Sequence, residues 1–137
     1  MKRAEFKVKI RNKDKQIEYR PVTGDVFKFQ ITRENKPFVF YIGVYHPIDK
    51  KTGKVNNRQY YIVDLKSGLS FAPVVKKKTK KEAINDVLNY LIYKMSPLII
   101  YDMIENAEPA GNDDVIKKLD DSQEILQIDL NVVRFIL

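Results

Sequence analysis

The sequence predicts an α+β fold, in which an antiparallel β-sheet of five to six strands over residues 5–75 is packed by C-terminal helices. Apolar and polar residues alternate with period two in residues 5–10 and 26–32, and further strand-like runs fill much of the first 75 residues. After residue 82, apolar residues recur every three or four positions, which is typical of helices lying on a sheet. Glycine, proline, asparagine and aspartate cluster between the alternating runs, as expected for turns between antiparallel strands.

Most of the expected strands follow one another through short connections, and a long loop separates 38–45 from 60–65. A turn containing Pro21 and Gly24 is expected to separate the second strand from the third. Pro73 cannot donate a hydrogen bond to a neighbouring strand, so the run that contains it is placed at a sheet edge. The predicted strands are 5–10, 16–22, 26–32, 38–45, 60–65 and 69–75, with a possible final strand at 126–132.

The strand at 38–45 is apolar or aromatic on both faces. Alternation places Phe38, Phe40, Ile42 and Val44 on one face and Val39, Tyr41, Gly43 and Tyr45 on the other. Such a strand is either central in a sheet that is covered on both sides, or it keeps one face half open with its tyrosines available.

Three helices are expected after the strands. Thr79 and Glu82 have the spacing of a capping box, so the first helix should begin there. Ser96 followed by Pro97 predicts the start of a second helix, which is apolar nearly all round and should be buried or shared with another subunit. Residues 108–112 break it, and 113–121 form a short acidic helix.

Charge is segregated along the chain, whose net charge is +7. Residues 1–81 carry 21 Lys and Arg against 7 Asp and Glu, whereas residues 82–137 carry 4 against 11. We expect one domain, 1–137, with a basic β-rich part, 1–78, and an acidic helical part, 79–137. Either the basic part presents a face to a polyanion, or the acidic part folds against it and cancels its charge.

Composition excludes several classes of site. The sequence has no cysteine, which removes disulfides, thiol chemistry and cysteine-ligated metals. His46 is the only histidine, and it is expected to be a loop residue before Pro47. No phosphate-cradling glycine motif occurs. We therefore expect no catalytic residue, metal ligand or cofactor, and the absence of a long apolar run favours a cytoplasmic protein with no membrane contact.

One enzymatic pattern remains as a less favoured alternative. Metal-dependent nucleases often hold Mg²⁺ between two carboxylates and place a lysine two residues after the second. Asp64 and Lys66 have that spacing, with Asp49 upstream. Asp64 also adjoins a Lys-Ser-Gly turn, where an acid commonly caps the backbone.

The favoured hypothesis is non-catalytic binding of nucleic acid, most simply single-stranded DNA or RNA. Single-strand binders combine cations that follow the phosphates with aromatic rings on which bases stack. A long basic loop between the strands 38–45 and 60–65, and a lysine cluster before the first helix, supply the cations. The predicted binding residues are Lys50, Lys51, Lys54, Arg58, Tyr45, Tyr60, Lys76, Lys77, Lys78, Lys80 and Lys81.

A curved antiparallel sheet with basic loops and a helix resembles the small single-strand binders of the OB-fold and whirly types, in topology and without a shared motif. Two other classes stay open. The protein could be an inhibitor or adaptor whose acidic tail contacts a basic protein. It could also be an assembly subunit or homodimer joined through the apolar C-terminus, 135–137.

Overall fold

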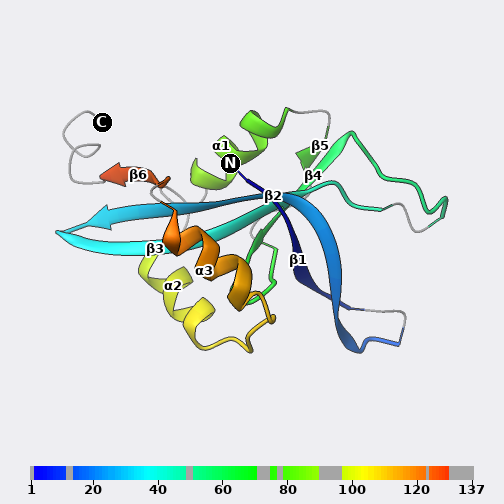
Figure 1. Cartoon of the computed structure of the whole chain (residues 1–137), viewed down its shortest axis with the longest axis horizontal. Coiled ribbons are helices and arrows are strands. Elements are labelled where there is room, and N and C mark those ends of the chain that lie inside the picture. The colour runs from blue at the N-terminus through cyan, green and yellow to red at the C-terminus, as the bar shows by residue number, and fades with distance from the viewer. Residues whose placement is uncertain are drawn as a thin grey trace.

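The computed structural model describes residues 2–11, 14–48, 51–70, 75–76, 79–89, 97–122 and 124–129, and these form an α+β fold (Figure 1). The strands are β1 (Lys2–Arg11), β2 (Ile17–Arg33), β3 (Lys36–Tyr45), β4 (Gln59–Asp64), β5 (Val75–Lys76) and β6 (Leu126–Asp129). The helices are α1 (Lys80–Asn89), α2 (Pro97–Glu105) and α3 (Asp113–Asp121). The predicted general class is therefore confirmed.

The sheet is antiparallel in the order β1-β2-β3-β4-β5. Its main body consists of β1 to β4, which is fewer strands than the five to six predicted for residues 5–75. β5 is only two residues long, and of the predicted strand 69–75 Ser70 forms one isolated bridge to Val63, while 71–74 lie outside the described residues. β6 pairs in parallel with residues 29–32 of β2, along the edge of β2 that does not face β3. This part of β2 lies beyond the residues that pair with β1.

The predicted turn at Pro21 and Gly24 is wrong, because β2 runs through both residues as one long strand. Its first half pairs with β1 and its second half with β3. Gly24 serves a close approach: a Cβ atom there would lie 2.1 Å from the carbonyl oxygen of Val44. Glycine in a strand commonly marks such a contact, and sequence alone does not distinguish it from a turn glycine.

The sheet curves until the turn after β4 reaches β1. The backbone N–H of Lys9 donates to the carbonyl of Gly68 at 2.9 Å, and the N–H of Leu65 donates to the carbonyl of Tyr41 at 2.8 Å. Gly68 has φ of +74°, which glycine adopts without steric cost. The curvature gives the protein two separate cores, one on each face of β3.

The two-sided pattern of β3 is explained by these cores, so the first of its two predicted positions, central and covered on both sides, is correct. On one face, Phe40 and Ile42 pack in a cluster with residues of α1 and α2. On the other face, Tyr45 packs with Phe6 of β1 and Leu119 of α3. A Cβ atom at Gly43 would lie 2.8 Å from the Phe6 ring, so the glycine makes room for that ring.

The helix starts follow the predicted signals. The Thr79 hydroxyl accepts a hydrogen bond from the N–H of Glu82 at 3.2 Å, and α1 begins at the next residue, Lys80. α2 begins at Pro97, and α3 spans the predicted 113–121. Among the helices within the described ranges, none combines the length and the apolar composition that a bilayer span requires.

A buried asparagine attaches α3 to the sheet. Asn112, directly before α3, is buried; its side-chain oxygen accepts from the N–H of Lys7 at 2.7 Å. Its amide nitrogen donates to the carbonyls of Lys7 and Leu65 at 2.9 and 2.8 Å. This residue therefore joins α3 to both β1 and the chain that follows β4.

Candidate nucleic-acid interface

β2 bends between the half that pairs with β1 and the half that pairs with β3 (Figure 1). A pocket of about 660 Å³ lies where this bend, β1, the end of β3, the loop between β3 and β4, and the start of α1 meet. Three of the predicted binding residues, Tyr45, Tyr60 and Lys80, line it. The loop contributes Ile48 and Val55. The structure thus brings the two basic segments of the sequence hypothesis, which are separated by some twenty residues along the chain, to one pocket.

The basic loop extends the β3–β4 hairpin. Ile48 and Val55 form an antiparallel bridge, and the N–H of Asn56 donates to the carbonyl of Pro47 at 2.8 Å. Gly53 has φ of +68°, as a turn at the tip requires. The loop is therefore a paired arm that projects from the sheet (Figure 1).

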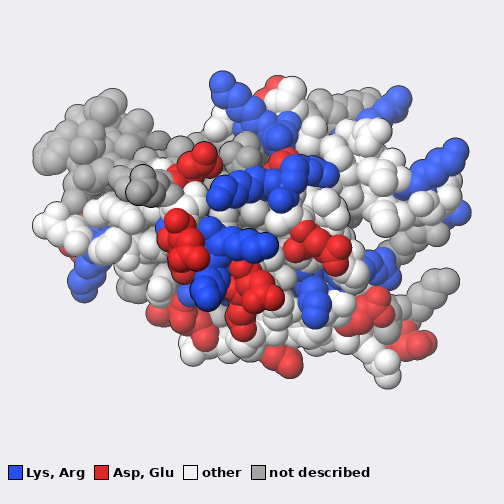
Figure 2. All heavy atoms as spheres, viewed as in Figure 1, with Lys and Arg blue, Asp and Glu red and all other residues white. Residues whose placement is uncertain are grey.

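The cations on this arm are open to solvent. Lys51, Lys54 and Arg58 are exposed, and Lys50 lies outside the described residues. Neither Lys54 nor Arg58 forms an ion pair with a carboxylate of the described chain. On the right of Figure 2, the described basic side chains at the end of the molecule that carries this arm stand apart from the acidic side chains drawn in red.

The lysine cluster before α1 is only partly described. Lys81 is exposed on the first turn of α1. Lys76 lies in β5, and Lys77 and Lys78 lie outside the described residues. Lys80 turns toward the pocket, and its ammonium group donates to Asp25 at 2.9 Å.

Asp25 was not predicted as a site residue, because it falls in the turn expected between the predicted strands 16–22 and 26–32. It is 8% exposed and lies between two cations, Lys80 at 2.9 Å and the Arg3 guanidinium at 3.8 Å. A signal was present: alternation along β2 places Asp25 on the same face as Phe27 and Phe29. An acid on an otherwise apolar face usually has a charged partner.

His46 and Tyr60 form an aromatic wall of the pocket. Their ring centres lie 4.5 Å apart at an interplanar angle of 45°. His46 Nδ1 lies 2.8 Å from the carbonyl oxygen of Gln59. Because a carbonyl can only accept, Nδ1 is the donor, and in the neutral ring Nε2 is an acceptor. The residue that was predicted to be an ordinary loop histidine thus belongs to the candidate site.

Tyr45 lines the pocket but belongs to the core. It is 7% exposed and packs edge to face against Phe6 and Tyr61, with ring centres 5.9 and 5.6 Å away. Burial, together with the neighbouring Tyr61, raises the pKa of Tyr45 to about 12. Its ring is therefore not open for base stacking, and Tyr60 is the better placed of the two predicted tyrosines.

The acidic helical part does neutralise some of the basic part, although away from the arm. Lys66 pairs with Glu105 of α2 at 2.8 Å, and Lys28 lies 3.8 Å from Asp120 of α3. Acidic and basic side chains are accordingly interspersed over the lower part of the face in Figure 2. Within the described chain, the acidic part therefore cancels the charge of Lys66 and Lys28.

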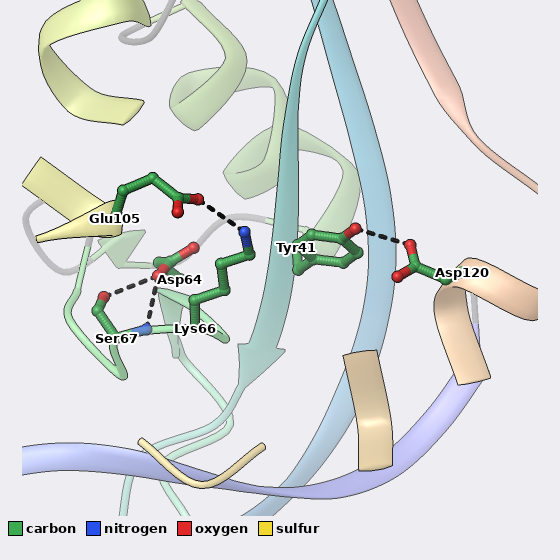
Figure 3. A network of polar contacts seen from close by, with 6 residues as sticks. All are labelled: Tyr41, Asp64, Lys66, Ser67, Glu105 and Asp120. Atoms are coloured by element: carbon green, nitrogen blue, oxygen red, sulfur yellow. Dashed lines mark hydrogen bonds and ion pairs between the residues drawn. The ribbon is translucent and has the colours of Figure 1, made fainter. Parts of the chain in front are cut away.

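The residues of the nuclease alternative form a structural network (Figure 3). Asp64 is 2% exposed, and one of its oxygens accepts from the backbone N–H and the hydroxyl of Ser67 at 2.8 and 2.7 Å. Burial raises the pKa of this carboxyl group. Asp49 lies outside the described residues, and the described chain contains no group of three His, Asp or Glu residues placed to hold a metal ion. Asp64 thus caps a turn.

The Lys66 ammonium beside this turn is held by aromatic rings as well as by Glu105. It lies 5.4 Å from the ring centre of Tyr41 and 5.9 Å from that of Tyr101. Partial burial lowers the pKa of Lys66, but the Glu105 carboxylate outweighs this effect, so the net shift is upward. The lysine stays charged and joins the turn to α2.

Comparison of the chain with protein-family models, with curated proteins and with solved structures gave no match.

Proposed function

We propose that this protein binds single-stranded nucleic acid along the arm between β3 and β4 and across the start of α1. The observation that carries the proposal is the convergence of the arm and the start of α1 on one pocket that Tyr60 lines. The arm and the first turn of α1 carry exposed cations, and aromatic rings line the pocket between them. Single-strand binders use this combination of cations and aromatic rings.

The arm and the first turn of α1 supply the phosphate contacts in this proposal. Lys51, Lys54 and Arg58 extend from the arm, and Lys81 is exposed on α1. The Arg58 guanidinium can contact a phosphate with two hydrogen bonds, whereas each lysine acts as a point charge. The proposal includes no catalytic residue, because the buried Asp64 carboxylate is bound to its own turn.

The test is the salt dependence of binding to a fluorescently labelled oligonucleotide, single-stranded or duplex, followed by anisotropy between about 50 and 200 mM NaCl. Replacing Lys51, Lys54 and Arg58 together by glutamine should flatten the slope of log K against log salt by about 2, because each single-strand phosphate contact contributes about 0.7. Tighter binding of single strands than of duplex is also expected.

The matched control replaces three exposed lysines on other elements, Lys36, Lys117 and Lys118, by glutamine. It removes the same charge, so it should leave the slope close to that of the wild type. Equal slopes for the wild type and the arm variant would contradict the proposal, as would a lack of binding at the lowest salt concentration.

A second candidate, an assembly subunit, is favoured by α2. Ile99 and Met103 lie one turn apart and are 55% and 57% exposed, while Ile100 and Ile104 of the same helix are buried. Sedimentation equilibrium of the wild type and of an Ile99→Ser, Met103→Ser double variant tests it. A wild-type oligomer that dissociates in the variant would support this function, and a monomer in both would remove it. The other predicted joint, 135–137, lies outside the described residues.

A further inference from the structure

We propose that the pocket between the arm and α1 holds one unpaired base of the bound strand, with the neighbouring phosphates outside on the arm. This inference rests on the proposed function and adds to it the chemical group that the pocket takes: a planar, uncharged heteroaromatic ring.

The charges of the pocket argue against a phosphate inside it. Both of its cations that the structure describes, Arg3 and Lys80, are directed at the Asp25 carboxylate. Glu5 is a second acid on the wall, so the four charged groups sum to zero. A phosphate that entered would compete with a carboxylate that is already buried between the two cations, whereas an uncharged ring would leave this arrangement intact.

The remaining walls suit a flat ring. Tyr60 and His46 present adjacent aromatic rings, and Ile48 and Val55 are each more than half exposed although they line the pocket. Apolar side chains that stay exposed beside aromatic ones mark a surface that a ligand can cover. The volume lies within the range of roughly 300–1,000 Å³ that is usual for small-molecule sites.

His46 adds a polar feature that matches a base. Its Nδ1 is bound by the Gln59 carbonyl, which leaves Nε2 of the neutral ring as a hydrogen-bond acceptor. Every nucleobase carries at least one N–H donor on its pairing edge, and this edge is accessible only when the base is unpaired. The pocket therefore favours single strands, because a base in a duplex has both its faces and its pairing edge occupied.

The test compares two oligonucleotides of equal length and phosphate count, one with its bases and one with abasic residues throughout, against the wild type and against Tyr60→Leu and Tyr60→Phe variants. The wild type should bind the base-bearing strand roughly five- to a hundredfold more tightly, as one stacked base contributes. Tyr60→Leu should lose this difference and keep the salt slope, while Tyr60→Phe should keep both. Circular dichroism establishes that each variant is folded.

The outcomes separate the two proposals. Equal binding of both strands by the wild type would overturn the base pocket and leave the proposed function in place, and this comparison needs no variant. A base preference that survives in folded Tyr60→Leu would also overturn the pocket, since the base would then bind elsewhere. Binding of neither strand would overturn the proposed function itself.

Discussion

Removing the charge of Asp25 should strengthen the binding of nucleic acid, although the substitution lies in a buried part of the site. Asp25 holds the Lys80 ammonium at 2.9 Å and the Arg3 guanidinium at 3.8 Å. In Asp25→Asn the side chain keeps its shape and can still accept hydrogen bonds, but neither cation is neutralised. Both become available to phosphates at the edge of the pocket.

The size of the effect follows from the two released cations. If one or both meet a phosphate, the slope of log K against log salt becomes steeper by about 0.7 to 1.4. The cost in stability should be about 1 kcal/mol or less, because the side chains of Lys80 and Arg3 are 42% and 67% exposed and such pairs are weakened by solvent.

Anisotropy titrations with a labelled single strand at several salt concentrations measure this slope. Asp102→Asn is the matched control, since it changes the net charge equally on α2, which packs at the opposite end of β3 through Tyr101 and Phe38. Its slope should equal that of the wild type. If Asp25→Asn and Asp102→Asn gave the same slope, Asp25 would not restrain cations that meet the strand, and the reasoning would be refuted.

Three further predictions concern the scaffold and use urea unfolding. Asn112→Ala removes three buried hydrogen bonds and leaves their backbone partners unsatisfied, so it should lower the free energy of unfolding by about 3 kcal/mol, whereas Asn106→Ala on the surface should change it by less than about 0.5 kcal/mol. Gly24→Ala should lower the free energy of unfolding by about 3 kcal/mol or more, because its Cβ would overlap a backbone carbonyl of β3. Gly53→Ala, in open space at positive φ, should lower it by about 1 kcal/mol. Burial raises the pKa of Asp64, so folding favours its protonated form. The stability of the wild type relative to Asp64→Asn should therefore fall as pH rises from about 4 through the raised pKa, and a difference that stays constant or grows between about pH 4 and 7 would contradict this.

The parts of the fold that local signals specify could be predicted from the sequence. The two-faced pattern of residues 38–45 indicated a central strand, and Thr79 and Pro97 marked helix starts that the structure reproduces. Each signal depends on neighbours within a few residues. The break at 108–112 was predicted in the same way, but the hydrogen bonds of Asn112 reach residues far along the chain, so its role in attaching α3 could not be predicted.

The error in β2 shows how one residue pattern can serve two structures. Pro21 and Gly24 are common in turns, and here they lie within a strand whose glycine allows β3 to come close. The strand-pairing partner decides between these outcomes, and that partner lies about twenty residues away in the sequence. Composition of the segment therefore could not decide it.

The bend of β2 between its two paired halves explains why the candidate site could be predicted only in part. Asp25 and Val26 are the residues of β2 that pair with β1 on one edge and with β3 on the other, so Asp25 is enclosed on both sides, with Arg3 directly opposite. The cations form visible clusters in the sequence. The pairing of β2 with both β1 and β3 decides which of these cations are neutralised. On the arm, Lys54 and Arg58 form no ion pair within the described chain, and this difference from Lys80 and Arg3 assigns phosphates to the arm and an uncharged base to the pocket.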